Sequence, residues 1–177
     1  VKDEDNVLFT RINGEKVTLE GYKNTKNAPK GFLFPRSETL MKYIRTDKGM
    51  ELADVVNEGG PSVLFGVRPC DARSFALLDM LFDQESYQDP YYIDKRNNTT
   101  VVALACVHPP YATCFCTSVG GNPASTDGAD VLLTDLGDSY LAEFLTDKGE
   151  KLLKYFGDTK ADAASEARKN EIAAAAE

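Results

Sequence analysis

The chain has 177 residues, 42% of them hydrophobic, and its 28 acidic and 20 basic side chains give a net charge of −8. This length fits one domain, or one domain with a short appendage, and it can bury a substantial core. The acidic balance excludes a general affinity for nucleic acid, because no cluster of Lys and Arg offsets repulsion from the phosphates. The longest uncharged apolar run, residues 99–106, is too short to cross a bilayer.

The two ends of the sequence bear on where the protein works. The first residues contain no leader of the charged, apolar and small-residue type, so we expect a cytoplasmic protein. The chain begins at Val1 and ends in the run IAAAAE, from which we expect a fragment of something longer.

The first sixty residues predict two local elements. Asn13-Gly14 separates residues 7–11 from residues 16–20 and is typical of the turn of a small hairpin. A helix is expected to begin at Pro35 and Ser37. The apolar stripe of that helix consists of Leu40, Met41 and Ile44.

A strand and a helix are predicted after Gly59-Gly60-Pro61. Residues 62–67 (SVLFGV) form a continuous apolar run, which indicates a strand covered on both faces. Residues 72–82 carry an apolar stripe at helical spacing, and Asp71 is a suitable N-cap for that helix.

The rest of the chain completes an α/β pattern. Residues 83–98 are polar and rich in tyrosine, so we expect a long connection there, followed by a second buried strand over residues 99–106. The resulting fold class is α/β: a small, mostly parallel sheet with flanking helices and an irregular cysteine-containing loop. The remaining expected elements are the loop 108–122, strands at 130–136 and 140–145, and helical segments at 149–156 and 160–176, the last projecting from the domain.

The four cysteines fall at informative places in this pattern. Cys70 follows the first buried strand directly, and Cys106 closes the second. Parallel neighbouring strands place both at the carboxyl edge of the sheet, where α/β folds bind ligands. Cys114 and Cys116 follow on the loop from that edge, and in an extended Cys-x-Cys segment both side chains point the same way. The four thiols are therefore expected to converge.

Convergent thiolates favour a soft metal, either Zn²⁺ or an iron–sulfur cluster. Cys70 begins a predicted helix, where the dipole favours a thiolate, and Arg68 and Arg73 add positive charge nearby. Other interpretations stay open: single cysteines are often buried in a core, the paired Cys-x₂-Cys knuckles of many zinc sites are absent, and one thiol could be reactive by itself.

The other polar candidates have simpler interpretations. His108 is the only histidine, and we expect a partly solvated loop residue there. Gly120-Gly121 lacks the motifs of a phosphate-binding loop and predicts a turn. Tyrosines in the 83–98 segment are expected to pack, and these are Tyr87, Tyr91 and Tyr92.

Several strings of the sequence resemble one family of redox subunits. Residues 66–72 (GVRPCDA) and 112–118 (ATCFCTS) are the most specific of them. Three further strings fit the same pattern: Lys30-x-x-x-Phe34-Pro35-x-x-Glu38, Asp89-Pro90-x-Tyr92 and Asp130-x-x-Leu133-Thr134-Asp135. Together they are similar to the beta subunits of soluble sulfhydrogenases and the A subunit of anaerobic sulfite reductase, over most of residues 28–150.

The resemblance implies a cytoplasmic electron carrier of anaerobes. Such subunits relay electrons between a flavin diaphorase subunit, or another donor, and a hydrogenase or sulfite reductase catalytic subunit. They normally continue into a ferredoxin-like domain with Cys-x₂-Cys-x₂-Cys-x₃-Cys-Pro motifs, which this sequence lacks. Residues 1–157 are therefore interpreted as the α/β cysteine-containing domain, and residues 158–177 as a projecting helix or linker toward a ferredoxin-like domain.

Two functions from different classes follow. The favoured hypothesis is a non-catalytic electron-transfer module that holds one iron–sulfur cluster, of the [4Fe–4S] type, on Cys70, Cys106, Cys114 and Cys116. The alternative is a scaffold or docking domain, with a structural zinc or no metal, that seats a ferredoxin domain against a catalytic subunit. A third possibility is thiol chemistry in sulfur metabolism, with Cys114 or Cys116 as the attacking group.

Overall fold

The computed structural model describes residues 22–54, 60–157 and 159–176, together with residues 2, 3, 6, 7, 12, 14 and 19. The hairpin predicted around Asn13-Gly14 falls largely outside the described residues. Of the amino-terminal segment, the short strands β1 (Lys2–Asp3) and β2 (Asn6–Val7) form an antiparallel pair.

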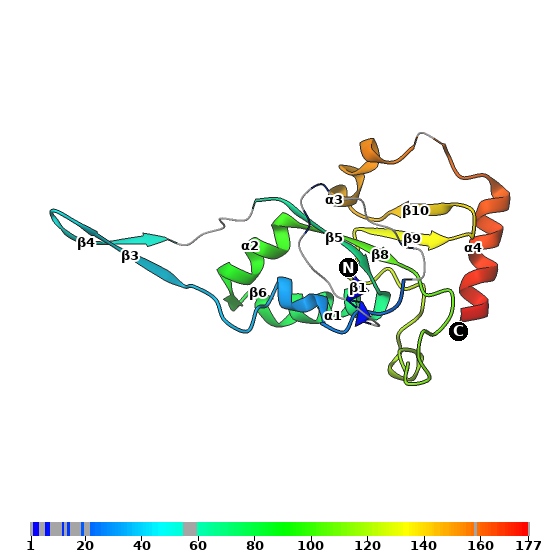
Figure 1. Cartoon of the computed structure of the whole chain (residues 1–177), viewed down its shortest axis with the longest axis horizontal. Helices are drawn as coiled ribbons and strands as arrows, with labels where there is room; N and C mark the ends of the chain where they lie inside the picture. The colour runs from blue at the N-terminus through cyan, green and yellow to red at the C-terminus, as the bar shows by residue number, and fades with distance from the viewer. Residues whose placement is uncertain are drawn as a thin grey trace.

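A four-stranded sheet in the order β10-β9-β8-β5 forms the centre of the fold (Figure 1). Strands β5 (Ser62–Val67), β8 (Thr99–Leu104) and β9 (Val131–Asp135) are parallel neighbours, and β10 (Tyr140–Phe144) pairs antiparallel with β9. The predicted α/β class with a mostly parallel sheet is confirmed, and all four predicted strands are present with ends shifted by two residues or fewer. Both faces of the sheet are covered, so the side chains on both sides of each strand are apolar. A continuous apolar run in the sequence therefore indicated each strand.

Two clusters of buried side chains cover the two faces of the sheet. On the helical face, Phe75 of α1 and Tyr92 of α2 are buried among residues of β5 and β8. On the opposite face, Leu104 and Leu133 pack with Tyr22 and other apolar side chains from both ends of the chain.

Helix α1 (Pro69–Phe82) begins three residues before the predicted start. Its N-cap is Arg68, and Asp71 lies in the first turn without capping the helix, so that prediction was wrong. The physical reason is Pro69, whose fixed φ suits the first helical position and whose missing N–H costs nothing there.

The segment 83–98 is not the long connection that its polar composition predicted. Strands β6 (Asp83–Gln84) and β7 (Tyr87–Gln88) form a small hairpin, and α2 (Pro90–Asn98) follows. Asp89 caps α2, since its side chain accepts hydrogen bonds from the backbone N–H groups of Tyr91 (2.9 Å) and Tyr92 (3.1 Å). The sequence contains the Asp89-Pro90 pair that commonly begins a helix. The helix was not predicted because the following residues carry no apolar stripe.

The helix predicted from residue 35 is also wrong, because the chain forms a hairpin there. Strands β3 (Met41–Thr46) and β4 (Gly49–Asp54) pair antiparallel around Asp47-Lys48, and we call residues 41–54 the hairpin arm. Gly49 has a φ of +132°, which a turn with glycine tolerates. In the strand the three apolar residues used to predict a helix do not share one face, since Met41 lies on the side of Tyr43, Ile44 lies on the other side and Leu40 precedes β3.

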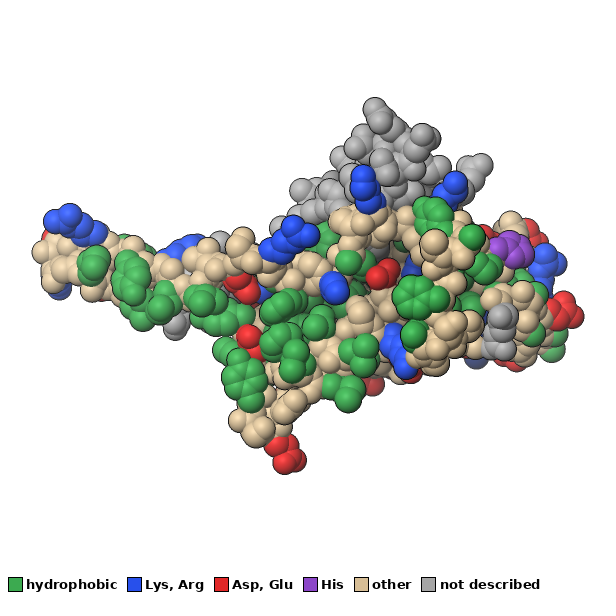
Figure 2. All heavy atoms as spheres, turned by 90° about the horizontal axis from the view of Figure 1, so that it is seen from below, with side chains coloured by type: hydrophobic (Ala, Val, Ile, Leu, Met, Phe, Trp, Pro, Cys, Tyr) green, Lys and Arg blue, Asp and Glu red, His purple; other side chains and the backbone are tan. Residues whose placement is uncertain are grey.

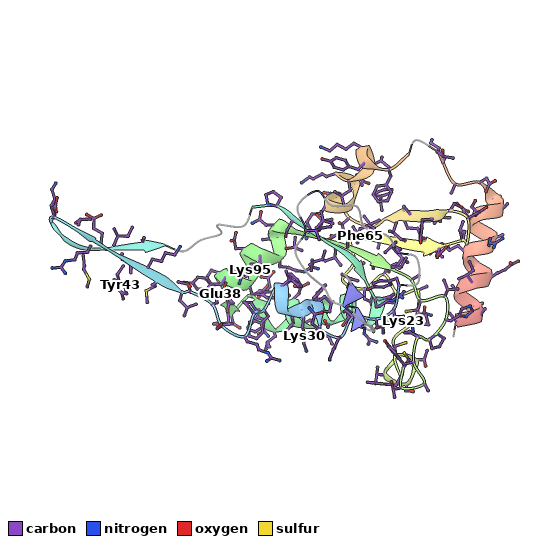
Figure 3. All side chains as sticks on the ribbon, in the orientation of Figure 1. Lys23, Lys30, Glu38, Tyr43, Phe65 and Lys95 are labelled. Atoms are coloured by element: carbon purple, nitrogen blue, oxygen red, sulfur yellow. The ribbon has the colours of Figure 1, made fainter. Side chains whose placement is uncertain are left out.

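The hairpin arm extends away from the rest of the molecule (Figure 1). Tyr43 pairs with Leu52, and side chains directly opposite in an antiparallel pair share a face, so Met41 and Met50 lie on that same apolar side. Figure 2 shows apolar side chains along the arm, and Figure 3 places Tyr43 on it. The base is attached to α2 by a Glu38–Lys95 ion pair and by the Tyr91 hydroxyl, which donates to the carbonyl of Leu40 (2.8 Å).

The described residues between 147 and 176 form two short helical segments and one longer helix. Where a single segment was predicted over 149–156, α3 (Asp147–Glu150) is separated from the 3₁₀ turn η3 (Leu153–Tyr155). Helix α4 (Ala163–Ala176) contacts β10, and Lys169 forms an ion pair with Glu143 (2.9 Å). The helix therefore lies against the edge of the sheet instead of projecting from it. The domain division at residue 157 stays a prediction.

Candidate metal centre

Cys70 is held by the junction between β5 and α1. The β5–β8 register shifts between Phe65 and Val67, where Gly66 has a φ of +79°. This bulge leads into the extended N-cap and Pro69, so Cys70 becomes the second residue of α1, directly beyond the carboxyl end of β5. The sequence correctly predicted this position.

Cys106 lies two residues beyond the end of β8, on the same edge. The backbone N–H of Ala105 still donates to the carbonyl of Leu133 in β9 (2.8 Å). The N–H of Cys106 donates to the carbonyl of Pro123 (2.9 Å), which joins the start of the cysteine loop to its end. Cys106 is therefore fixed by the sheet and by the closure of the loop.

Cys114 and Cys116 belong to an irregular loop beyond this edge, visible in yellow-green in Figure 1. The irregular loop was predicted, whereas the extended Cys-x-Cys geometry was not confirmed. Cys116 has helical dihedral angles (φ −56°, ψ −39°) and precedes the 3₁₀ turn η2 (Thr117–Val119), so alternation along a strand does not orient these two side chains.

Two contacts hold the cysteine loop in place. The carbonyl of Cys116 accepts the N–H of Gly121 (2.8 Å), and a Cβ at Gly121 would lie 2.9 Å from that oxygen. The guanidinium of Arg73 on α1 donates to the carbonyl of Val119 (3.2 Å). The loop therefore turns back toward the helix that carries Cys70.

Neighbouring thiols affect the ionisation of Cys70 and Cys106. All four are free cysteines. Shielding from water, followed by the negative charges of Asp71, Cys106 and Cys116, raises the pKa of Cys70 to about 11. Shielding also raises the pKa of Cys106, and the Cys116 and Cys114 thiolates raise it further, whereas Arg68 lowers it.

This result corrects the expectation that the helix N-terminus keeps Cys70 ionised. Loss of water and nearby negative charge outweigh the helix dipole at this position. At neutral pH the Cys70 thiol is therefore protonated in the metal-free protein. A metal that binds it must displace a proton, so higher pH favours metal loading.

The structure brings the four cysteines to one edge without closing them on one point. In the described ranges, no three His, Cys, Asp or Glu side chains are arranged to hold a metal ion. The chemistry of the donor set fits a soft metal, since four sulfur ligands suit iron–sulfur clusters and zinc. Ligation by all four would require their side chains to lie closer together than they do in this structure.

The position of Arg68 differs from what the sequence predicted. Predicted only as a charge near Cys70, it is buried, with 8% of its surface exposed. Its guanidinium donates to the carbonyls of Ala105 (3.2 Å) and Leu104 (3.4 Å), so it joins the start of α1 to the end of β8.

Tyr22 is a residue of this edge that sequence reasoning missed. Its ring lies 4.5 Å from the guanidinium carbon of Arg68, and its hydroxyl donates to the carbonyl of Gly66 at the bulge. Burial raises the pKa of Tyr22 to about 12. The Tyr22–Gly66 bond spans 44 residues, and no local pattern in the sequence indicates such a long-range contact.

Most of the remaining candidates keep their structural interpretations, but the packing predicted for Tyr87 is wrong, because 59% of its surface is exposed. His108 is exposed in the loop. Gly120 has a φ of +69° and its N–H donates to the carbonyl of Thr117, as expected for a turn. The Tyr92 hydroxyl donates to Asp79 (2.6 Å) in the packed interface between α1 and α2.

Comparison with known proteins finds one clear similarity. The chain is 32% identical over 154 residues to the sulfhydrogenase 2 subunit beta of Pyrococcus furiosus. The match covers 86% of this chain and 43% of the relative, so the chain spans less than half the length of the protein it matches. No protein-family model and no solved structure matches the chain. None of the helices in the described part of the chain combines the length and apolar character that crossing a membrane requires.

Proposed function

We propose that the chain, which is 32% identical over 154 residues to a sulfhydrogenase beta subunit, is a member of that family and an electron-transfer module of a hydrogenase-type redox complex. In this proposal Cys70, Cys106, Cys114 and Cys116 hold one iron–sulfur cluster, of the [4Fe–4S] type. The supporting observation is that four free thiols from β5–α1, β8 and one loop gather at the carboxyl edge of a parallel sheet.

The four ligands would have different parts in this centre. Cys70 and Cys106 follow strands of the central sheet and would fix the position of the cluster. Cys114 and Cys116 would close over it from the loop. A bound cluster would accept and pass on one electron at a time, and its potential depends on burial and on nearby charges and hydrogen bonds.

The exposed side of the loop would face the electron partner. Cys114 and its neighbour Phe115 are exposed, so an electron partner could approach the centre closely from this side. The proposed partners are a ferredoxin-like domain, a flavin diaphorase subunit, and a hydrogenase or sulfite reductase catalytic subunit. The proposed location is the cytoplasm.

A scaffold function is the second candidate, and one observation favours it. No metal-ligating trio is already assembled in the part of the chain that is described. Under this alternative the thiols hold one zinc ion or only pack, and the domain seats redox partners without carrying electrons itself.

Elemental analysis after anaerobic reconstitution separates the two functions. An electron-transfer module should contain about four iron and about four sulfide per chain, with visible charge-transfer absorbance. Serine substitution of any one of the four cysteines should remove most of the iron, whereas Ser118→Ala in the same exposed loop should retain it. About one zinc per chain, or no metal in the native protein, would rule out the electron-transfer proposal.

A further inference from the structure

Helix α1 has apolar side chains on two sides, and only one side is covered. Ala72 and Phe75 on the inner side are completely buried against the sheet. Three further apolar side chains of α1 stay more than half exposed, and these are Leu77, Met80 and Leu81. Residues three and four positions apart are neighbours on one side of a helix, so these three form a continuous strip that faces solvent. We call residues 77, 80 and 81 the outer strip.

The hairpin arm presents a second exposed apolar surface. On its apolar side, the Tyr43–Leu52 pair lies between Met41 and Met50. All four side chains are more than half exposed, and Met50 keeps 73% of its surface exposed. Figure 2 shows apolar side chains along the arm and on the adjoining part of the body. A two-stranded ribbon is only marginally stable in water until one of its faces packs against another element.

The two surfaces are bordered by opposite charges. The free end of the arm, residues 45–49, contains Arg45, Asp47 and Lys48 and has a net charge of +1. In the described part of the chain, neither Arg45 nor Lys48 forms an ion pair. Residues 79–89, which include the end of α1 and the hairpin after it, contain four acidic residues and no Lys or Arg. The carbonyl end of a helix adds a partial negative charge at the same place.

The two surfaces also agree in size. The six residues of β3 extend about 20 Å, and the 14 residues of α1 extend about 21 Å, so an arm can cover the outer strip and bring its basic end to residues 83–85. The seven exposed apolar side chains offer roughly 100–150 Å² each, so placing each arm on the helix of a second copy would bury about 1,600 Å² in total. A stable, specific protein interface has this area.

We propose that the hairpin arm and the outer strip of α1 join two copies of this chain, with each arm lying on the helix of the other copy. One chain supplies both halves of the contact, a basic apolar ribbon and an acidic apolar helix end, and this favours a second copy over a different protein. The exchange is reciprocal, so it closes as a two-fold dimer and covers both arms and both strips. It does not depend on the electron-transfer proposal, because the outer strip lies at the end of α1 opposite Cys70.

Sedimentation analysis of the full chain is the first test. The native chain should be a dimer at about 100 µM, with a dissociation constant in about the micromolar range. Tyr43→Asp on the arm and Leu81→Lys on the outer strip each introduce a charge of the same sign as the surface they face. Each should therefore weaken association about tenfold or more.

Two matched variants in η3 are the controls for this test. Tyr155→Asp and Leu153→Lys make the same changes at side chains that are exposed to a similar degree, and both should associate like the native chain. Equal association of all four variants would overturn the proposal. A native chain that stays monomeric at about 100 µM would also overturn it and leave the arm to a different subunit.

An exchange of charge between two variants tests whether the contact is reciprocal. The first variant combines Arg45→Glu with Lys48→Glu, and the second combines Asp83→Lys with Glu85→Lys. Each variant alone brings like charges together and should associate about tenfold more weakly than the native chain or worse. In a one-to-one mixture, a mixed dimer has opposite charges at both contacts, so its affinity should return to within about tenfold of native. If both variants are folded by circular dichroism and the mixture associates no better than either variant alone, the proposal is overturned.

Discussion

The cysteine end of the sheet and the hairpin arm lie at opposite ends of the molecule (Figure 1), and different interactions stabilise them. At the cysteine end, Arg68 and Tyr22 connect segments more than forty residues apart, and the helix beside them buries Phe75 completely. On the hairpin arm the bonds shown are between neighbouring strands, and Tyr43 keeps 63% of its surface exposed. Side chains of similar size should therefore contribute very differently to folding at the two ends.

Replacing one aromatic side chain at each end tests this difference, and it should give the largest effect. Phe75→Ala leaves a cavity between α1 and the sheet, so the free energy of unfolding should fall by about 3–5 kcal/mol. Tyr43→Ala loses only a cross-strand pair with Leu52 and should cost about 1 kcal/mol or less. Denaturant unfolding measures both, and equal losses would contradict the comparison.

A glycine beneath α1 should be the next most sensitive position. A Cβ at Gly128 would lie 2.1 Å from the carbonyl oxygen of Ala72, so Gly128→Ala must displace the helix that carries Cys70. We expect a loss of about 1–3 kcal/mol in thermal or denaturant unfolding. Gly31→Ala is the control, because its Cβ would have no neighbour within 4 Å. Similar stability of the two variants would show that α1 is not tightly packed there.

The smallest effect is a pH dependence at the cysteine end. Burial raises the pKa of Tyr22 from 10.0 to about 12, so folding favours its protonated form. The resulting stability is fully present below pH 10 and is lost as pH rises toward 12. Unfolding measured from pH 8 to 12 should show a shallower loss in Tyr22→Phe than in the native protein. Burial of Tyr92 also raises its pKa, so part of the slope should remain.

Tyr43→Phe makes the same chemical change on the exposed hairpin arm and is the control for this series. A native slope in Tyr22→Phe would mean that burial does not raise the pKa of the Tyr22 hydroxyl in the folded protein.

The sequence predicted well the elements in which local pattern and burial agree. The apolar runs over residues 62–67 and 99–106 located two neighbouring parallel strands, and those strand ends placed Cys70 and Cys106 at one edge. Prediction failed near Ile44, where the apolar spacing predicted a helix and pairing with residues 49–54 forms a strand instead. It also failed at α2, where a capping signal was outweighed by polar composition.

The candidate site divides in the same way. The choice of the four cysteines as candidate ligands and their common edge follow from the sequence alone, because strand ends and loop positions are local properties of the chain. The burial of Arg68 does not, because its acceptors come from Tyr22, Asn24 and the end of β8, which only folding brings together. Tertiary structure also decided that the pKa of Cys70 is raised, because shielding and neighbouring negative charge outweigh the dipole of its own helix.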